Sequence, residues 1–316
     1  MSTDATAGRI TRGAGRRPRA LRPATWPGAG CWDMTRSDGR AYRIFIQEPE
    51  GPPPAAGYPV LFLTDGNWLF PLVAPMLPMR TQMRELRPAL LVAIGYATDD
   101  ASAPGRLRAF DLTPPTPNDY AAAPGAVGPY GGADALLDFI LGKVLDRLAR
   151  RFPVDRGDLS LMGDSLGGLH VLHALFTRPE RFRSFVAASP SIWWNDRAVL
   201  AGEAAFTARA RAGEVSPRVL VTVGGLEQSL NPPPQMPGLS AVKAAALIRE
   251  ARMVDNAREL GERLMALSEE TRVEARFVAF PDETHQSVIP ANLSRGVTFA
   301  LSPSTEPTMR PGIDPA

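Results

Sequence analysis

Ser165 stands in the pentapeptide Gly163-Asp164-Ser165-Leu166-Gly167, between a short apolar run and a segment whose apolar residues have helical spacing. An order of strand, sharp turn and helix lifts a serine hydroxyl clear of a sheet, and the glycines leave room for the neighbouring backbone. The first amides of the helix can then stabilise an oxyanion on the attacked group. The motif therefore predicts a nucleophile elbow. The alternative is a glycine-rich turn in which the serine has no catalytic role.

A serine nucleophile needs a base within hydrogen-bond reach, because its hydroxyl reacts poorly at its own pKa. The chain has three histidines. His170 and His173 lie on the expected helix after the serine, and a rise of ~1.5 Å per residue carries them away from the turn. His285 follows the last expected strand, where the chain order of serine, acid and histidine places a base. We therefore expect His285 to be the base.

The acid that orients the histidine is expected after the preceding strand, residues 218–224. Glu227 is the first carboxylate beyond that strand. It would hold His285 in the productive tautomer and stabilise the imidazolium. Asp255, Asp282 and a serine–histidine pair without a third member are the alternatives.

Backbone amides are the expected oxyanion donors. The first is the N–H of Leu166, directly after the serine. The second is expected from the loop that follows the apolar run 58–64, where Asn67 and Trp68 are candidates. An Asp65-Gly66 turn that only reverses the chain is the alternative for that loop.

Two stretches are candidates for substrate binding. Residues 96–132 are rich in proline and glycine, and we expect a long irregular loop at the carboxyl end of a strand, where open α/β sheets bind ligands. Its Arg106 and Arg108 either line a pocket for an anionic substrate or are solvated surface charges. Trp193 and Trp194 follow the strand 185–189, and they either contact the substrate or pack at the rim.

Strands and helices alternate along the chain, which predicts one α/β domain with a doubly wound, mostly parallel sheet flanked by helices. Apolar runs at 58–64, 89–95, 159–163, 185–189, 218–224 and 273–280 predict buried strands, and residues 41–47 alternate like an early strand. Residues 133–152 predict an amphipathic crossover helix. Further helices are expected within 239–267 and 291–301. The domain is expected to span 29–302.

The composition is that of an ordinary globular protein, with 44% apolar and 22% charged residues and a net charge of +2. We find no basic patch with interleaved aromatics that would indicate nucleic-acid binding, and no apolar run of the ~20 residues that span a membrane. Cys31 is the single cysteine, so no internal disulfide can form. Residues 1–28 predict a disordered basic leader, or a targeting arm, and 303–316 a disordered tail. Without a signal-peptide core, a cytoplasmic location is expected.

Five sequence blocks occur together and in order: 57–67, 163–168, 188–195, 253–256 and 283–285. Together they resemble the esterase family of α/β-hydrolases that includes the bacterial siderophore esterases, which hydrolyse ferric enterobactin and salmochelin trilactones. The resemblance implies an α/β-hydrolase fold and a serine esterase that needs neither metal nor cofactor. It also implies Ser165 and His285 as the working pair.

The expected activity is hydrolysis of a small-molecule carboxylic ester through an acyl-enzyme, with the trilactone of a ferric catecholate siderophore as a candidate substrate. A feruloyl or acetyl carbohydrate esterase, or an acyltransferase, would use the same residues on the same fold. A non-catalytic binding protein on this scaffold is the remaining alternative. The sequence leaves the oligomeric state open.

Overall fold

The computed structural model describes residues 25–98, 100, 102–115, 129–231, 233 and 238–303. These residues contain the strands β1 (Ala29–Thr35), β2 (Ala41–Gln47), β3 (Tyr58–Leu63), β4 (Leu90–Tyr96), β5 (Val154–Asp164), β6 (Ser184–Ala188), β7 (Arg218–Gly224) and β8 (Glu274–Phe280). They form one sheet in the order β1-β2-β4-β3-β5-β6-β7-β8. β2 pairs antiparallel with β1 and β4, and the other neighbours pair parallel. The carboxyl ends of β3 to β8 therefore meet at one edge.

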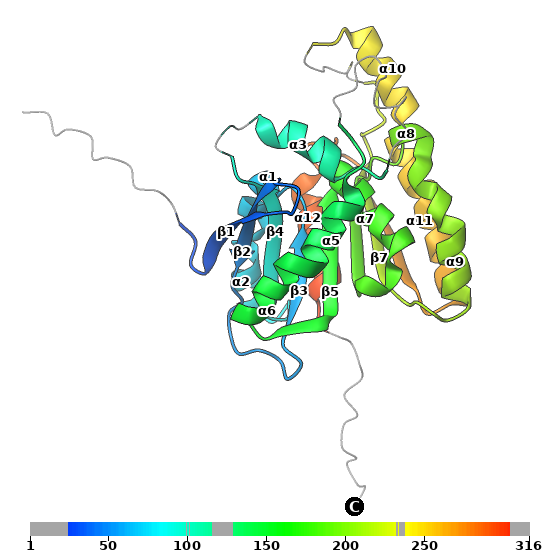
Figure 1. Ribbon diagram of the computed structural model, residues 1–316. Helices are drawn as coiled ribbons and strands as arrows, with labels where there is room; N and C mark the ends of the chain where they lie inside the picture. Colours follow the sequence, from blue (N-terminus) through cyan, green and yellow to red (C-terminus); the bar gives the residue numbers. More distant parts are fainter. Residues whose placement is uncertain are drawn as a thin grey trace, which may run out of the picture.

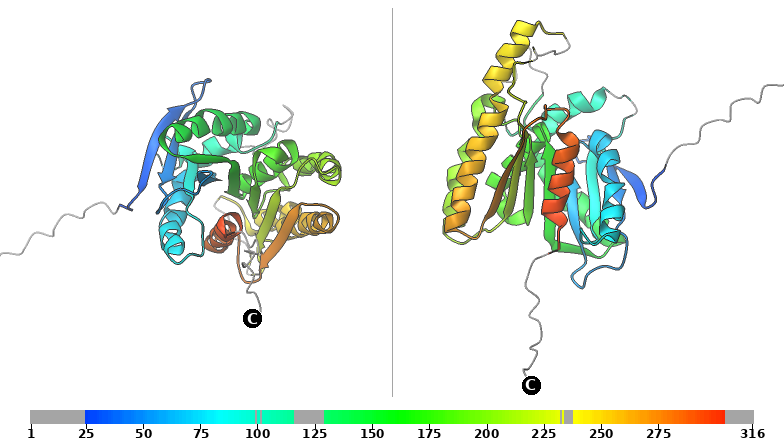
Figure 2. Two further views of the ribbon diagram at one scale, coloured as in Figure 1. Left: turned by 90° about the horizontal axis from the view of Figure 1, so that it is seen from below. Right: turned by 180° about the vertical axis from the view of Figure 1, so that it is seen from behind.

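Helices cover both faces of this sheet (Figures 1 and 2). The helical segments are α1 (Gly66–Val73), α2 (Met76–Gln82), α3 (Ala103–Asp111), α5 (Ala133–Phe139), η1 (Ile140–Val144), α6 (Leu145–Arg151), α7 (Leu166–Thr177), η2 (Pro179–Arg181), α8 (Trp194–Arg197), η3 (Ala198–Gly202), α9 (Glu203–Arg211), α10 (Ala241–Ala251), α11 (Met253–Glu270) and α12 (Ile289–Leu301). One buried cluster joins α5, α6, α7, α9 and α11 to one face, and a second joins α1, α2 and α12 to the other. This confirms the predicted doubly wound α/β class.

The central strands are apolar because both of their faces are covered. Every residue of β3 and β4 is buried, as expected for parallel strands between two helix layers. The predicted runs 58–64 and 89–95 therefore correspond to these strands to within one residue at each end. β5 lies between β3 and β6, which places its carboxyl end at the middle of the sheet edge.

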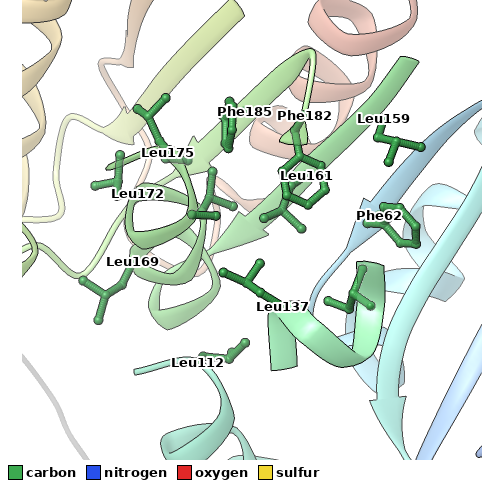
Figure 3. Close-up of a cluster of buried hydrophobic side chains, with 14 of the residues drawn as sticks. Phe62, Leu112, Leu137, Leu159, Leu161, Leu169, Leu172, Leu175, Phe182 and Phe185 are labelled. Atoms are coloured by element: carbon green, nitrogen blue, oxygen red, sulfur yellow. The ribbon is translucent and has the colours of Figure 1, made fainter. Parts of the chain in front are cut away.

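The larger core cluster lies between this sheet and the helices that follow β4 and β5 (Figure 3). Phe62, Leu161 and Phe185 come from three neighbouring strands, and Leu137 and Leu172 come from α5 and α7. All five side chains have no exposed surface. Burial of each one stabilises the fold by roughly 1.5–3 kcal/mol relative to exposure. This packing sets the position of α7, and with it the turn at its start.

The structure corrects two sequence-based expectations. Residues 96–132 were expected to be an irregular loop, but they include α3, which spans Ala103–Asp111. The sequence did not predict this helix because Pro104 and Gly105 are poor helix formers. Proline is nevertheless well tolerated in the first turn of a helix. Residues 99, 101 and 116–128 of that stretch lie outside the described residues. The expected crossover helix 133–152 is divided into α5, η1 and α6, with a π-helical turn at η1.

The predicted leader and tail fall mostly on residues 1–24 and 304–316, which lie outside the described residues. Among the helices that the structure does describe, none is both long and apolar enough to cross a bilayer.

Candidate active site

Ser165 lies on a sharp turn between β5 and α7. Its φ of 61° and ψ of −116° belong to a region that residues other than glycine rarely occupy. The Ser165 N–H donates to the Ala188 carbonyl at 3.0 Å, and the Ser165 carbonyl accepts from the Ser191 N–H at 3.1 Å. The end of β6 and the residues after it therefore hold the turn in this strained conformation, with the serine side chain partly exposed.

Two glycines make the turn sterically possible. A Cβ on Gly163 would overlap the backbone of Gly167, and a Cβ on Gly167 would overlap Thr64 Oγ1 at the end of β3. Both positions therefore exclude a side chain, which gives the Gly-x-Ser-x-Gly spacing a physical reason.

The structure leaves two of the three predicted oxyanion amides without a backbone partner. Leu166 and Asn67 are the first and second residues of α7 and α1, and the described residues offer no backbone acceptor to either N–H. The Asn67 side chain fixes its loop by accepting from the Tyr96 N–H at 2.7 Å and donating to the Tyr96 carbonyl at 3.1 Å. The Trp68 N–H donates to the Asp65 carbonyl at 3.0 Å, so it is not available as the predicted donor.

His285 lies in the loop between β8 and α12, with its side chain 34% exposed. Its Nδ1 is 2.6 Å from Glu227 Oε2. Burial of the imidazole lowers its pKa, but the hydrogen bond to Glu227 and the charges of Glu227 and Asp164 outweigh burial, so the pKa of His285 is raised. Within the described structure no hydrogen bond joins His285 to Ser165, whose Oγ lies 3.3 Å from Ser191 Oγ. Catalytic hydrogen bonds are often long in proteins without substrate.

The Glu227 side chain is fully buried just beyond β7. Its Oε1 accepts from the Gly224 N–H at 2.6 Å and from Ser189 Oγ at 2.5 Å, while Oε2 faces His285. A buried carboxylate requires such partners, because leaving it unpaired is costly. The structure therefore brings Glu227 to the histidine.

The two other acid candidates do not reach the histidine ring. Asp255 on α11 accepts from Gln228 Nε2 at 2.7 Å and from Arg258 at 3.4 Å. Asp282 is an exposed residue of the loop after β8. Among the three candidates from the sequence, Glu227 is the one that is hydrogen bonded to His285.

The two histidines on α7 lie away from this site. His170 has no exposed surface, and burial lowers its pKa to about 3. Neither of its ring nitrogens has a hydrogen-bond partner in the part of the chain that the structure describes. His173 Nε2 is 2.9 Å from Asp134 Oδ1.

The two arginines predicted for substrate binding have different environments. Arg108 forms a bidentate ion pair with Asp65, with Nε–Oδ1 and Nη2–Oδ2 distances of 2.7 and 2.9 Å. Its guanidinium also donates to the Asp164 carbonyl at 3.3 Å. Because Asp65 already neutralises it, Arg108 joins α3 to the loop after β3 and is not a free charge for a substrate. Arg106 is exposed and pairs with Asp100 at 3.1 Å.

The two adjacent tryptophans also differ. Trp194 is 3% exposed and packs edge-on against Tyr130, with 5.8 Å between the ring centroids. It is therefore a core residue, which corrects its prediction as a substrate contact. Trp193 is 39% exposed and Trp68 is 44% exposed, so each has ring surface that a ligand could cover.

Two polar residues around Glu227 were not identified from the sequence. Ser189 donates to Glu227 Oε1, and Asn292 Nδ2 donates to Ser189 Oγ at 3.1 Å. A sequence signal for Asn292 does exist, because it is an amide on the apolar face of α12, where buried polar groups need partners. The described residues contain no cluster of three or more His, Cys, Asp or Glu side chains that could hold a metal ion.

Comparison with known proteins gives consistent matches. The chain matches the family model described as "Putative esterase" over residues 35–260. It is 35% identical over 274 residues to the ferri-bacillibactin esterase of Bacillus subtilis, covering 85% of this chain and 88% of that protein. It is 39% identical over 249 residues to the siderophore triacetylfusarinine C esterase of Aspergillus fumigatus, covering 76% and 80%. A siderophore hydrolase structure from Aspergillus nidulans superposes with a TM-score of 0.74 at 31% identity, covering 90% and 98%.

Proposed function

This chain belongs to the "Putative esterase" family, and from that premise we propose that it hydrolyses a siderophore ester through a serine acyl-enzyme. Family membership and the relatives make it a carboxylic ester hydrolase with an α/β-hydrolase fold, as the five sequence blocks implied. The proposal adds the nucleophile, the base, the acid and the substrate class. The observation that carries it is the 2.6 Å contact between His285 and Glu227 at the sheet edge that bears Ser165.

Ser165 is the nucleophile in this proposal. As Ser165 Oγ attacks the ester carbonyl, His285 Nε2 takes its proton, and the carbonyl oxygen becomes an oxyanion. The N–H groups of Leu166 and Asn67 would donate to that oxyanion, because both lie at the starts of helices and have no backbone acceptor among the described residues. The tetrahedral intermediate then expels the alcohol, which takes the proton from His285. Water then attacks the acyl-enzyme while His285 takes its proton. The second tetrahedral intermediate releases the carboxylic acid, and Ser165 Oγ regains its proton from His285.

Glu227 supports the base in two ways. By accepting from Nδ1 it leaves Nε2 without a proton and able to accept one from the serine, and its charge stabilises the imidazolium formed during attack. The raised pKa of His285 makes the ring a stronger base, but only its neutral form can take the proton. The rate is therefore expected to rise with pH through that pKa.

The substrate class rests on the relatives. The B. subtilis relative carries the name of a ferri-bacillibactin esterase and the A. fumigatus relative that of a triacetylfusarinine C esterase. Both are matched over three quarters or more of this chain. A siderophore ester is therefore the substrate class that best fits the chain.

The test is hydrolysis of p-nitrophenyl acetate, ferri-bacillibactin, triacetylfusarinine C and enterobactin by the native protein and by Ser165→Ala. We expect Ser165→Ala to lose at least about 1,000-fold in kcat and all labelling by a fluorophosphonate probe. Ser191→Ala is the matched control, because its hydroxyl lies 3.3 Å from Ser165 Oγ, and it should still be labelled. Full activity of Ser165→Ala would refute the mechanism, and activity confined to p-nitrophenyl acetate would refute the substrate class.

A further inference from the structure

A chain of buried polar side chains connects the carboxylate of Glu227 to the carboxyl group of Asp164, the residue before the proposed nucleophile. Asn292 on α12 is at its centre, because its Nδ2 donates to Asp164 Oδ1 and to Ser189 Oγ, both at 3.1 Å. Ser189 Oγ donates to Glu227 Oε1 at 2.5 Å. Asn292 and Ser189 have no exposed surface, the Glu227 side chain is fully buried, and Asp164 is 7% exposed. Four elements that are distant in sequence thus meet in one desolvated set of hydrogen bonds.

The direction of these hydrogen bonds is determined by the groups at the ends. Thr222 Oγ1, from β7, lies 2.7 Å from Asn292 Oδ1 and donates to it, which directs the amide nitrogen toward Asp164 and Ser189. An ionised Glu227 can only accept, so the Ser189 hydrogen is directed to Glu227 and its oxygen accepts from Asn292. Hydrogen bonds that run in one direction polarise and strengthen one another in a low-dielectric interior.

The backbone at Ser189 supports a role in function. Its φ is 39°, in the left-handed region that residues other than glycine rarely adopt. The Ser189 N–H donates to the Thr222 carbonyl at 2.8 Å, which continues the pairing of β6 with β7 beyond Ala188. Strained residues persist where the surrounding structure fixes them, and they concentrate at functional sites. Here the strained residue presents its hydroxyl to Glu227.

We propose that Asn292 is a positioning residue for ester hydrolysis, which through Ser189 holds Glu227 against His285 and couples that pair to Asp164. The inference rests on the proposed serine mechanism and adds a residue that none of its steps uses. Within the described structure Asn292 makes no hydrogen bond to Ser165 or His285, so its effect on the reaction is indirect. The amide nitrogen of Asn292 donates to both Asp164 and Ser189. A carboxylate or an apolar side chain of similar size could not donate these two hydrogen bonds.

The coupling to Asp164 has a measurable sign. Burial, helped by the charges of Glu227 and Asp65, raises the pKa of Asp164 to about 7, and the His285 charge and the Asn292 hydrogen bond oppose this rise. Arg108 is a further charged neighbour, and its guanidinium donates to the Asp164 carbonyl. Loss of the Asn292 donor raises the pKa of Asp164 further, so at neutral pH less negative charge faces His285. The pKa of His285 then falls.

The experiment compares Asn292→Ala, Ser189→Ala and the double variant in hydrolysis of p-nitrophenyl acetate from pH 5 to 9. Loss of a hydrogen bond to a charged group predicts a fall in kcat of about 10- to 100-fold, with KM changed less than twofold. The acidic limb of the Asn292→Ala profile should move to lower pH. Asn292 and Ser189 act on Glu227 through the same series of hydrogen bonds. The double variant should therefore be no slower than the slower single variant.

Val297→Ala is the control for helix packing, because Val297 is buried on the same helix as part of an apolar cluster. It should lower the melting temperature and leave kcat and the pH profile unchanged. If Asn292→Ala does not fold, the comparison of Thr222→Val with Thr222→Ser tests the proposal instead. Thr222→Val removes the hydroxyl that orients the Asn292 amide, and Thr222→Ser retains it. Thr222→Val should then be slow and Thr222→Ser close to native.

Native kcat in folded Asn292→Ala, strictly multiplicative effects in the double variant, or equal rates for the two Thr222 variants would overturn the proposal. These outcomes are distinguishable from failure of the serine mechanism, which would appear as activity in Ser165→Ala. A slow Asn292→Ala with an unmoved acidic limb would overturn the coupling to Asp164.

Discussion

Replacement of Glu227 by glutamine is the most direct perturbation of the proposed histidine–acid pair. Glutamine has almost the same volume as glutamate, so the fully buried site is not left with a cavity. Its amide oxygen can still accept from the Gly224 N–H and the Ser189 hydroxyl. Its NH₂ group would then face Nδ1 of His285 and donate to it. That hydrogen bond places the ring proton on Nε2, in the tautomer that cannot take a proton from Ser165.

The expected loss follows from the charge and from the tautomer. Two unit charges ~4 Å apart at an effective dielectric constant near 20 interact by about 4 kcal/mol. Loss of that stabilisation of the imidazolium corresponds to roughly 1,000-fold in rate, at about 1.4 kcal/mol per factor of ten. Amide replacement of the acid in a serine protease with a Ser-His-Asp triad costs about 10,000-fold through the tautomer. We therefore expect kcat of Glu227→Gln to fall by about 1,000- to 10,000-fold.

The assay is hydrolysis of p-nitrophenyl acetate between pH 5 and 9, together with thermal unfolding. Because Glu227 raises the pKa of His285, its replacement should also move the acidic limb of kcat/KM to lower pH. Glu227→Asp is the control that keeps the charge and shortens the reach, and it should lose less activity. A folded Glu227→Gln within tenfold of native kcat would show that Ser165 and His285 operate without a third member.

Five further substitutions follow from the environments of two arginines, two tryptophans and His170. Arg108→Ala should destabilise the fold by about 3–5 kcal/mol by unpairing a buried carboxylate, whereas exposed Arg106→Ala should cost under about 0.5 kcal/mol in thermal unfolding. Trp194→Ala should lower the free energy of unfolding by about 3–5 kcal/mol, because the ring is buried. The exposed Trp193 differs: Trp193→Ala should change KM for a siderophore and leave the melting temperature within a few degrees. Because its folded pKa is lowered, His170 contributes stability that is lost as pH falls from about 6.5 toward 3, so His170→Leu should lower the pH midpoint of acid unfolding measured by circular dichroism.

Local patterns were sufficient to predict the sheet and the sharp turn at Ser165. Strands buried on both faces must be apolar at nearly every position, so β3 and β4 could be predicted from continuous apolar runs in the sequence. Gly163 and Gly167 could be predicted because a Cβ at the first would overlap the Gly167 backbone and a Cβ at the second would overlap the Thr64 side chain. His285 and Glu227 could be placed because parallel strands deliver the residues that follow them to one edge. All of these features depend on short segments or on chain order.

Pairings between distant segments could not be predicted in this way. Arg108 belongs to a helix hidden in a proline- and glycine-rich stretch, and its partner Asp65 lies 43 residues earlier. Without the partner, its charge was equally consistent with a substrate contact. Trp193 and Trp194 are identical in type and adjacent, and the buried ring of Trp194 differs from the exposed one through its packing in the core, which includes Tyr130. Asn292 meets groups that are 70 to 128 residues away.

The charges around the elbow constrain how an anionic substrate can bind. Asp65 is paired with the Arg108 cation, Glu227 is hydrogen bonded to His285, and Asp164 lies among them with its pKa raised to about 7 by burial. An added negative charge deep in this edge would meet three carboxyl groups in a low-dielectric region, where like charges repel strongly. The ester carbonyl can approach Ser165, because the oxyanion it forms would be met by backbone amides. The anionic part of a ferric siderophore must therefore remain toward solvent, near exposed groups of the rim.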